Sequence, residues 1–100
     1  MDEGCADVVG ATAQQAADGS WTFEVTVSSA DTGWDKYADA WEVRSPDGSV
    51  IGTRVLTHPH ETEQPFTRSL SGVTVSDDEV VIAARDSVAG FCGDTVRLSL

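Results

Sequence analysis

The sequence predicts a single all-β domain over residues 1–100, an immunoglobulin-like antiparallel β-sandwich of about seven strands. Three observations favour this fold class. Apolar and polar residues alternate with a period of two, β-branched residues are frequent, and turn-forming residues separate the alternating runs. One hundred residues is the usual length of one domain and is enough for one modest core.

Seven short segments carry the strand pattern. The clearest is 21–29, where a tryptophan, a phenylalanine and two valines occupy alternate positions. A turn at 45–48, with sequence SPDG, joins the third segment to the fourth as a hairpin, because proline fixes φ and glycine readily adopts a positive φ. The expected strands are 6–13, 21–29, 38–45, 49–57, 66–73, 79–86 and 94–100.

The third segment predicts part of the core. Trp41 stands where immunoglobulin-like domains often bury a tryptophan. Asp39 shares its alternating face, and a carboxylate on a core face needs a partner. We expect Arg68 to pair with Asp39, with Arg54 or Arg85 as alternatives. The other interpretation of Asp39 is a carboxylate that binds a ligand.

Charge excludes some partners. The chain has six basic and seventeen acidic residues, for a formal net charge of −11. Such a surface repels phosphate backbones, so we expect no nucleic acid partner. No apolar run is long enough to span a membrane. Residues 1–4 do not have a signal-peptide pattern, and the sequence is compatible with a signal segment having been removed before Met1.

The chain contains two cysteines, Cys5 and Cys92, near its opposite ends. We expect them to form one disulfide, which is typical of small domains in an oxidising compartment. This places the protein in the periplasm or outside the cell. The alternative is two unrelated thiols in a cytosolic protein.

Both histidines lie in one proline-rich segment. In an extended chain, His58 and His60 would point the same way, about 6.5 Å apart, and could chelate copper or zinc. Glu61, Glu63 or Asp35 could add oxygen ligands. The alternative interpretation is a crossover between the two sheets with histidines on the surface.

A second cluster alternates aromatic and acidic residues. Trp34, Asp35, Tyr37 and Asp39 lie around a loop-to-strand junction, and Phe91 lies in the loop before the last strand. An exposed aromatic side chain among polar groups often marks a contact surface. The spacing of the carboxylates does not match a calcium-binding loop.

No enzymatic motif is complete. The chain has no G-x-S-x-G elbow, no phosphate-binding loop and no dinucleotide fingerprint. A cysteine nucleophile would need a free thiol and a base beside it. We therefore expect that the protein is not an enzyme.

Four segments form a distinctive signature. They are GWDxYADxWEV at 33–43, PDG at 46–48, GTRVLxHPHExxQPFTRSL at 52–70 and, more weakly, ARDSxxGFxG at 84–93. In these segments the chain resembles a family of small exported bacterial β-domain proteins without an assigned activity. The resemblance implies export and includes His58 and His60 in the signature, but it implies no substrate.

The sequence therefore predicts a non-enzymatic exported domain, periplasmic or secreted, that binds an unknown protein or small ligand through its loops. The alternative is a periplasmic protein that binds copper or zinc through the His58-Pro59-His60 segment. No other cofactor is expected.

Overall fold

The computed structural model describes residues 4–100, so the expectation about the residues around Met1 lies largely outside the described part. The described residues form seven strands in two antiparallel sheets, which confirms the predicted β-sandwich. The strands are β1 (Asp7–Gln15), β2 (Trp21–Ser28), β3 (Ala38–Arg44), β4 (Val50–Val55), β5 (Phe66–Val73), β6 (Glu79–Asp86) and β7 (Val96–Ser99).

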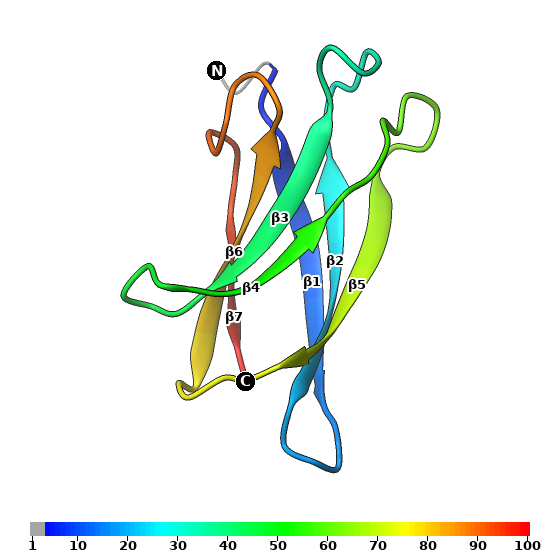
Figure 1. Ribbon diagram of the computed structural model, residues 1–100. Coiled ribbons are helices and arrows are strands. Elements are labelled where there is room, and N and C mark those ends of the chain that lie inside the picture. Colours follow the sequence, from blue (N-terminus) through cyan, green and yellow to red (C-terminus); the bar gives the residue numbers. More distant parts are fainter. Residues whose placement is uncertain (1–3) are drawn as a thin grey trace.

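The two sheets face each other as layers (Figure 1). One sheet has the order β1-β2-β5 and the other has the order β4-β3-β6-β7. The chain therefore crosses between layers after β2, β4 and β5. Because β4 pairs with β3 and β5 pairs with β2, β4 and β5 are edge strands of different sheets.

The core lies between the layers and follows the alternation seen in the sequence. Trp41 has no exposed surface, as predicted, and the packing around it is built from alternate residues of β2, β3 and β6. The largest fully buried apolar side chains are Trp41, Phe23, Phe66, Ile82, Val25, Val27, Val43 and Val80.

Three strand ends differ by two residues from the expected bounds, since β1 ends at Gln15, β4 ends at Val55 and β7 begins at Val96, and the other ends agree to within one residue. β1 continues to Gln15, which pairs with Trp21, because the hairpin turn is tight and closes with a bond from the Gly19 amide to the Ala16 carbonyl. β7 begins only at Val96. The preceding Asp94 instead bonds to β1, accepting from the Val8 amide through its carbonyl.

A β-bulge in β3 changes the predicted direction of Asp39. Opposite β6, Ala38 pairs with Asp86 and Ala40 pairs with Arg85, so Asp39 is an extra residue. The bulge places Ala38 and Trp41 in the core and shifts Asp39 toward the outer face. The prediction that Asp39 shares the core face of Trp41 is therefore wrong, because strict alternation does not continue through a bulge.

The predicted disulfide between Cys5 and Cys92 is present, with 5.5 Å between the Cα atoms. It ties the segment before β1 to the β6–β7 loop. Gly93 makes this contact possible, since a Cβ atom there would lie 2.1 Å from the Ala6 carbonyl oxygen. Beside it, the Asp94 amide donates to Asp7 Oδ1 over 2.7 Å.

Three loops, β2–β3, β4–β5 and β6–β7, gather at one end of the sandwich, which is the upper end in Figure 1. Leu100 lies toward the other end. In the described part of the chain, no helix is long and apolar enough to cross a membrane.

Candidate functional site

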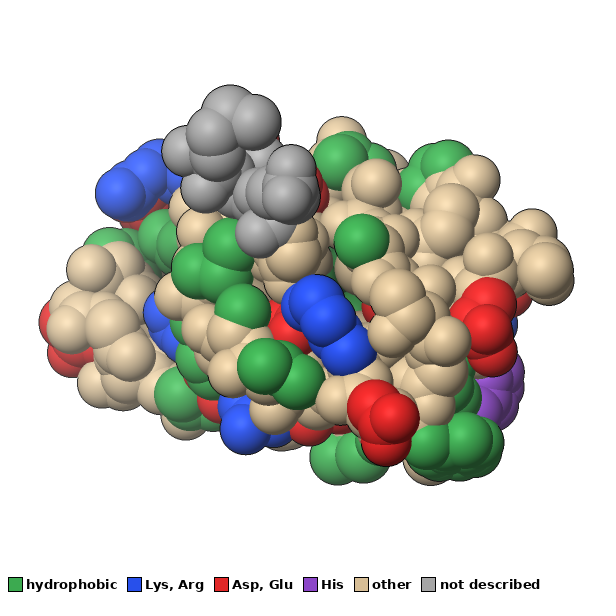
Figure 2. All heavy atoms as spheres, turned by 90° about the horizontal axis from the view of Figure 1, so that it is seen from above, with side chains coloured by type: hydrophobic (Ala, Val, Ile, Leu, Met, Phe, Trp, Pro, Cys, Tyr) green, Lys and Arg blue, Asp and Glu red, His purple; other side chains and the backbone are tan. Residues whose placement is uncertain are grey.

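The end of the sandwich where these three loops meet holds several of the predicted site residues. Figure 2 looks onto this end and shows hydrophobic, acidic and histidine side chains together along one border. We call Trp34, Asp35, Tyr37 and Val88 the loop-end surface. Trp34 and Val88 are each 68% exposed, the largest fraction among the exposed large apolar residues.

Trp34 stands at the tip of a tight turn in the β2–β3 loop. The Thr32 amide donates to the Lys36 carbonyl over 3.0 Å, and the Lys36 amide donates to the Gly33 carbonyl over 3.2 Å. Gly33 has φ of 147°, which suits a residue without a side chain. The indole packs edge-on against Tyr37, with 5.6 Å between ring centroids. The turn thus displays a large aromatic side chain to solvent.

Lys36 anchors this turn to the neighbouring loop. Its Nζ lies 2.6 Å from Asp86 Oδ2 and donates to the Gly4 carbonyl over 2.5 Å. Burial alone would raise the pKa of Asp86, but the hydrogen bonds from Lys36 and from the Ala89 and Val88 amides outweigh it and lower that pKa. Asp86 is therefore a buried carboxylate that organises both loops.

Tyr37 and Ser87 join the same two loops through a reciprocal pair of hydrogen bonds. The Tyr37 amide donates to Ser87 Oγ over 3.1 Å, and the Ser87 amide donates to the Tyr37 carbonyl over 2.8 Å. Ser87 precedes Val88, so this pair places the exposed Val88 near the aromatic turn. The loop-end surface is therefore built from two loops that are bonded to each other.

Asp31 holds the third loop in place, a role that the sequence pattern does not predict. Its buried carboxylate accepts from Ser29 Oγ over 2.7 Å, from the Ala38 amide over 2.9 Å and from the His60 amide over 2.8 Å. One side chain thus links β2, β3 and the β4–β5 crossover. An aspartate just after a strand is a weak signal for such a role, because similar residues begin ordinary turns.

His60 is buried against the end of β5 and is not a surface histidine. Its ring stacks on Phe66, with 3.9 Å between centroids and 12° between planes. His60 Nε2 lies 3.0 Å from Arg68 Nη2. Since arginine can only donate, Nε2 accepts and Nδ1 carries the proton. Burial, followed by the charge of Arg68, lowers the pKa of His60, so the ring is neutral near pH 7.

The structure gives no support to the metal interpretation of this segment. The rings of His58 and His60 are close, with 4.5 Å between centroids, but the lone pair of His60 Nε2 already faces Arg68. Glu63 pairs with Arg68 over 2.9 Å, and Glu61 is exposed. Across residues 4–100, no group of three or more His, Cys, Asp or Glu side chains is placed to hold a metal ion. The crossover interpretation describes this segment correctly, except that His60 is buried.

The remaining predicted contact residues lie elsewhere. Asp39 forms an ion pair with Arg85, so the expectation of Arg68 as first partner is wrong and the alternative Arg85 is confirmed. Phe91 is 42% exposed, and the guanidinium of Arg44 lies 4.6 Å from its ring centroid. Asp39 and Phe91 both belong to the outer side of the four-stranded sheet and not to the loop-end surface.

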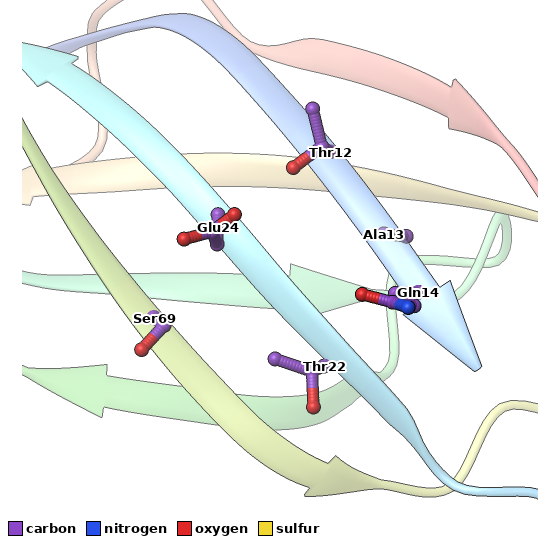
Figure 3. A pocket seen from close by; sticks show the side chains of 6 residues that line it. All are labelled: Thr12, Ala13, Gln14, Thr22, Glu24 and Ser69. Carbon is purple, nitrogen blue, oxygen red and sulfur yellow. The ribbon is translucent and has the colours of Figure 1, made fainter. Parts of the chain in front are cut away.

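A shallow groove of about 470 Å³ lies on the outer face of the three-stranded sheet, far from the positions expected from the sequence. Figure 3 shows Glu24 on β2 between Thr12 on β1 and Ser69 on β5, with Gln14 and Thr22 further along. These side chains offer hydroxyl, amide and carboxylate groups on an open surface. They supply no enclosed cavity and no aromatic platform for a ligand.

Comparison with known proteins gives one relative. The chain is 38% identical over 92 residues to a protein named "Putative lipoprotein" from Halomicrobium mukohataei. The match covers 91% of this chain and 45% of the relative, so the chain spans less than half the length of that protein. No protein-family profile matches the chain, and no solved structure matches it.

Proposed function

We propose that this domain is an exported, non-enzymatic binding module that contacts a partner protein through the loop-end surface. The observation that carries the proposal is Trp34, which is 68% exposed although the turn that bears it is tightly bonded. Exposing an indole to water is unfavourable unless another surface covers it. A side chain that is already held in place loses little conformational entropy on binding.

Two further features support the choice of a protein partner. Tryptophan and tyrosine are enriched among the residues that contribute most to protein–protein binding, and Trp34 and Tyr37 pack together here. Asp35 is exposed beside Trp34, and the whole chain carries a net charge of −11. The partner would therefore present an apolar pocket with basic residues at its rim.

Export is supported by two independent findings. The disulfide between Cys5 and Cys92 is of the kind that persists in oxidising compartments. The similar protein from Halomicrobium mukohataei has a name that describes a lipoprotein, which is a protein of the cell envelope. The proposal places this domain in the cell envelope or outside the cell.

The proposal is tested by photo-crosslinking in cell-envelope extract, with the wild-type domain and two variants immobilised side by side. Trp34→Ala removes the exposed indole, and Val9→Ala is a matched control that trims another exposed apolar residue, on β1. We expect a protein that crosslinks to the wild-type domain and to Val9→Ala but not to Trp34→Ala. The purified partner should then bind the Trp34→Ala variant about thirtyfold more weakly, since a hot-spot truncation costs about 2 kcal/mol.

Equal capture by the wild-type domain and by Trp34→Ala would contradict the proposal. Matching melting temperatures of the variants would show that any difference does not come from unfolding.

A further inference from the structure

β4 and β5 border one side of the sandwich as edge strands, and each has a single neighbour within its sheet. They lie close together, since a Cβ atom at Gly52 on β4 would be 3.1 Å from Leu70 and 3.2 Å from Val73 on β5. We call the unpaired side of Val50–Val55 the β4 edge. In a strand with one neighbour, alternate residues direct their backbone N–H and C=O groups away from the sheet.

The β4 edge carries almost none of the features that normally prevent strand addition. Its sequence, VIGTRV, has no lysine, proline or carboxylate, and four of its six residues are β-branched. Val50 is 50% exposed and Val55 is 61% exposed. There are two exceptions. One is a β-bulge, since Val43 pairs with Gly52 and Arg44 pairs with Val50, which leaves Ile51 as an extra residue. The other is Arg54, whose side chain points toward the same side as Gly52, because residues two apart in a regular part of a strand share a face.

Arg54 is also exceptional in its charge balance. The other five cationic side chains each form an ion pair, and they are Lys36, Arg44, Arg68, Arg85 and Arg97. Among residues 4–100, Arg54 has no ion-pair partner, although the chain has an excess of carboxylates. Its Nε atom is buried without a hydrogen-bond partner in this part of the chain, and so is the indole nitrogen of Trp41, the residue paired with Arg54 on β3.

We propose that the β4 edge binds an extended polypeptide segment as an added strand, and that Arg54 selects a segment with a carboxylate on its inward side. Strand addition would cover Arg54 further, and burying a cation without a partner is costly. A segment without a carboxylate is therefore disfavoured. An acidic segment supplies the missing partner while its backbone bonds to the free groups of β4.

A second copy of the domain does not fit this edge. If β4 paired with itself, neither strand would offer a carboxylate to Arg54, because β4 contains none. Two domains with a net charge of −11 each would also repel one another. Neither β4 nor β5 carries an acidic residue, so the strands on this side add no direct repulsion against an acidic segment.

The test is a titration of the full chain with two capped octapeptides, monitored by the amide signals in NMR spectra. High ionic strength screens the overall repulsion between the acidic chain and an acidic peptide. One peptide alternates valine with glutamate and the other alternates valine with glutamine. We expect amide shifts concentrated in β4 and about tenfold tighter binding of the glutamate peptide, the size of one charge-assisted hydrogen bond. Arg54→Gln should abolish this preference, and the control Val9→Ala should retain it.

The inference is overturned if the two peptides bind wild-type protein equally, if neither binds, or if the shifts map to another strand edge. It is also overturned if the protein alone self-associates through β4 in sedimentation experiments. The comparison of peptides on the wild-type protein needs no variant, so a poorly folded Arg54→Gln protein would not obscure the result. Because this edge does not include Trp34, failure here leaves the loop-end proposal intact.

Discussion

At the scale of single residues, His60 shows why a His-x-His pair is a weak predictor of a metal site. The prediction assumed an extended segment that directs both rings to the same side. In the structure, His60 is 4% exposed, stacks on Phe66 and accepts a hydrogen bond from Arg68. His58 is exposed, and its ring lies against the ring of His60. The burial of the His60 ring depends on Asp31 in the β2–β3 loop and on Phe66 at the start of β5, and local sequence spacing does not reveal these contacts.

His60 should make stability depend on pH. Because its pKa is lowered in the folded protein, the unfolded chain binds more protons between that lowered pKa and about 6.5. The contribution is fully present above about pH 6.5 and is lost as pH falls from there through the lowered pKa. Urea unfolding between pH 7.5 and 5 should therefore show falling stability in wild type and a flatter profile in His60→Gln. Parallel profiles would contradict the neutral, buried ring.

The ion pair between Asp39 and Arg85 is partly exposed, with side-chain exposures of 20% and 43%. Solvent screens such a pair, so we expect a coupling energy of about 0.5–1 kcal/mol. A double-mutant cycle with Asp39→Asn and Arg85→Gln measures it, and the same cycle with Arg68→Gln in place of Arg85→Gln should give no coupling. Coupling to Arg68 instead would mean that β3 has no bulge at this position.

At the scale of elements, most strands could be predicted from alternating apolar residues and from the turn signals between them, although β6 has an unbroken apolar run from Val80 to Ala84. The segments 66–73 and 79–86 match β5 and β6, and the turn after β3 closes as expected, with the Gly48 amide donating to the Ser45 carbonyl. The bulge at Asp39 and the late start of β7 were missed. Both depend on contacts with strands that are distant in sequence, namely β6 and β1.

The candidate site was predicted only in part, for a similar reason. Trp34 and Tyr37 were expected at a contact surface and do pack together. The residues that hold them, Asp31, Lys36 and Asp86, could not be recognised, because Lys36 and Asp86 are fifty positions apart along the chain. Such pairs become visible only once the two loops are placed side by side.

The disulfide acts on two elements, β1 and the β6–β7 loop. It joins residues 87 positions apart, so in the chain-entropy model it removes freedom from almost the whole unfolded chain. We expect the Cys5→Ser/Cys92→Ser variant to be less stable by up to about 4–5 kcal/mol, measured by urea unfolding. Alkylation of the native wild-type protein without reductant should leave its intact mass unchanged, and a gain of two alkyl groups would refute the bridge.

At the scale of the whole molecule, charge opposes compactness. Seventeen acidic residues outnumber six basic ones, and five of the basic residues are already paired in the described structure. The remaining carboxylates repel one another, and salt screens that repulsion. The midpoint of urea unfolding should therefore rise with sodium chloride. A falling midpoint would show that ion pairs matter more than net repulsion.

The proposed binding function requires that the loop-end surface is formed before any partner binds. The most direct test is backbone ¹⁵N relaxation of the free protein, which reports motion of residues 32–37 on the picosecond-to-nanosecond timescale. The bonds from Thr32, Lys36 and Tyr37 predict order parameters of about 0.85 in this turn, equal to those of β3. Values below about 0.6 would show a flexible loop and would contradict a preformed surface.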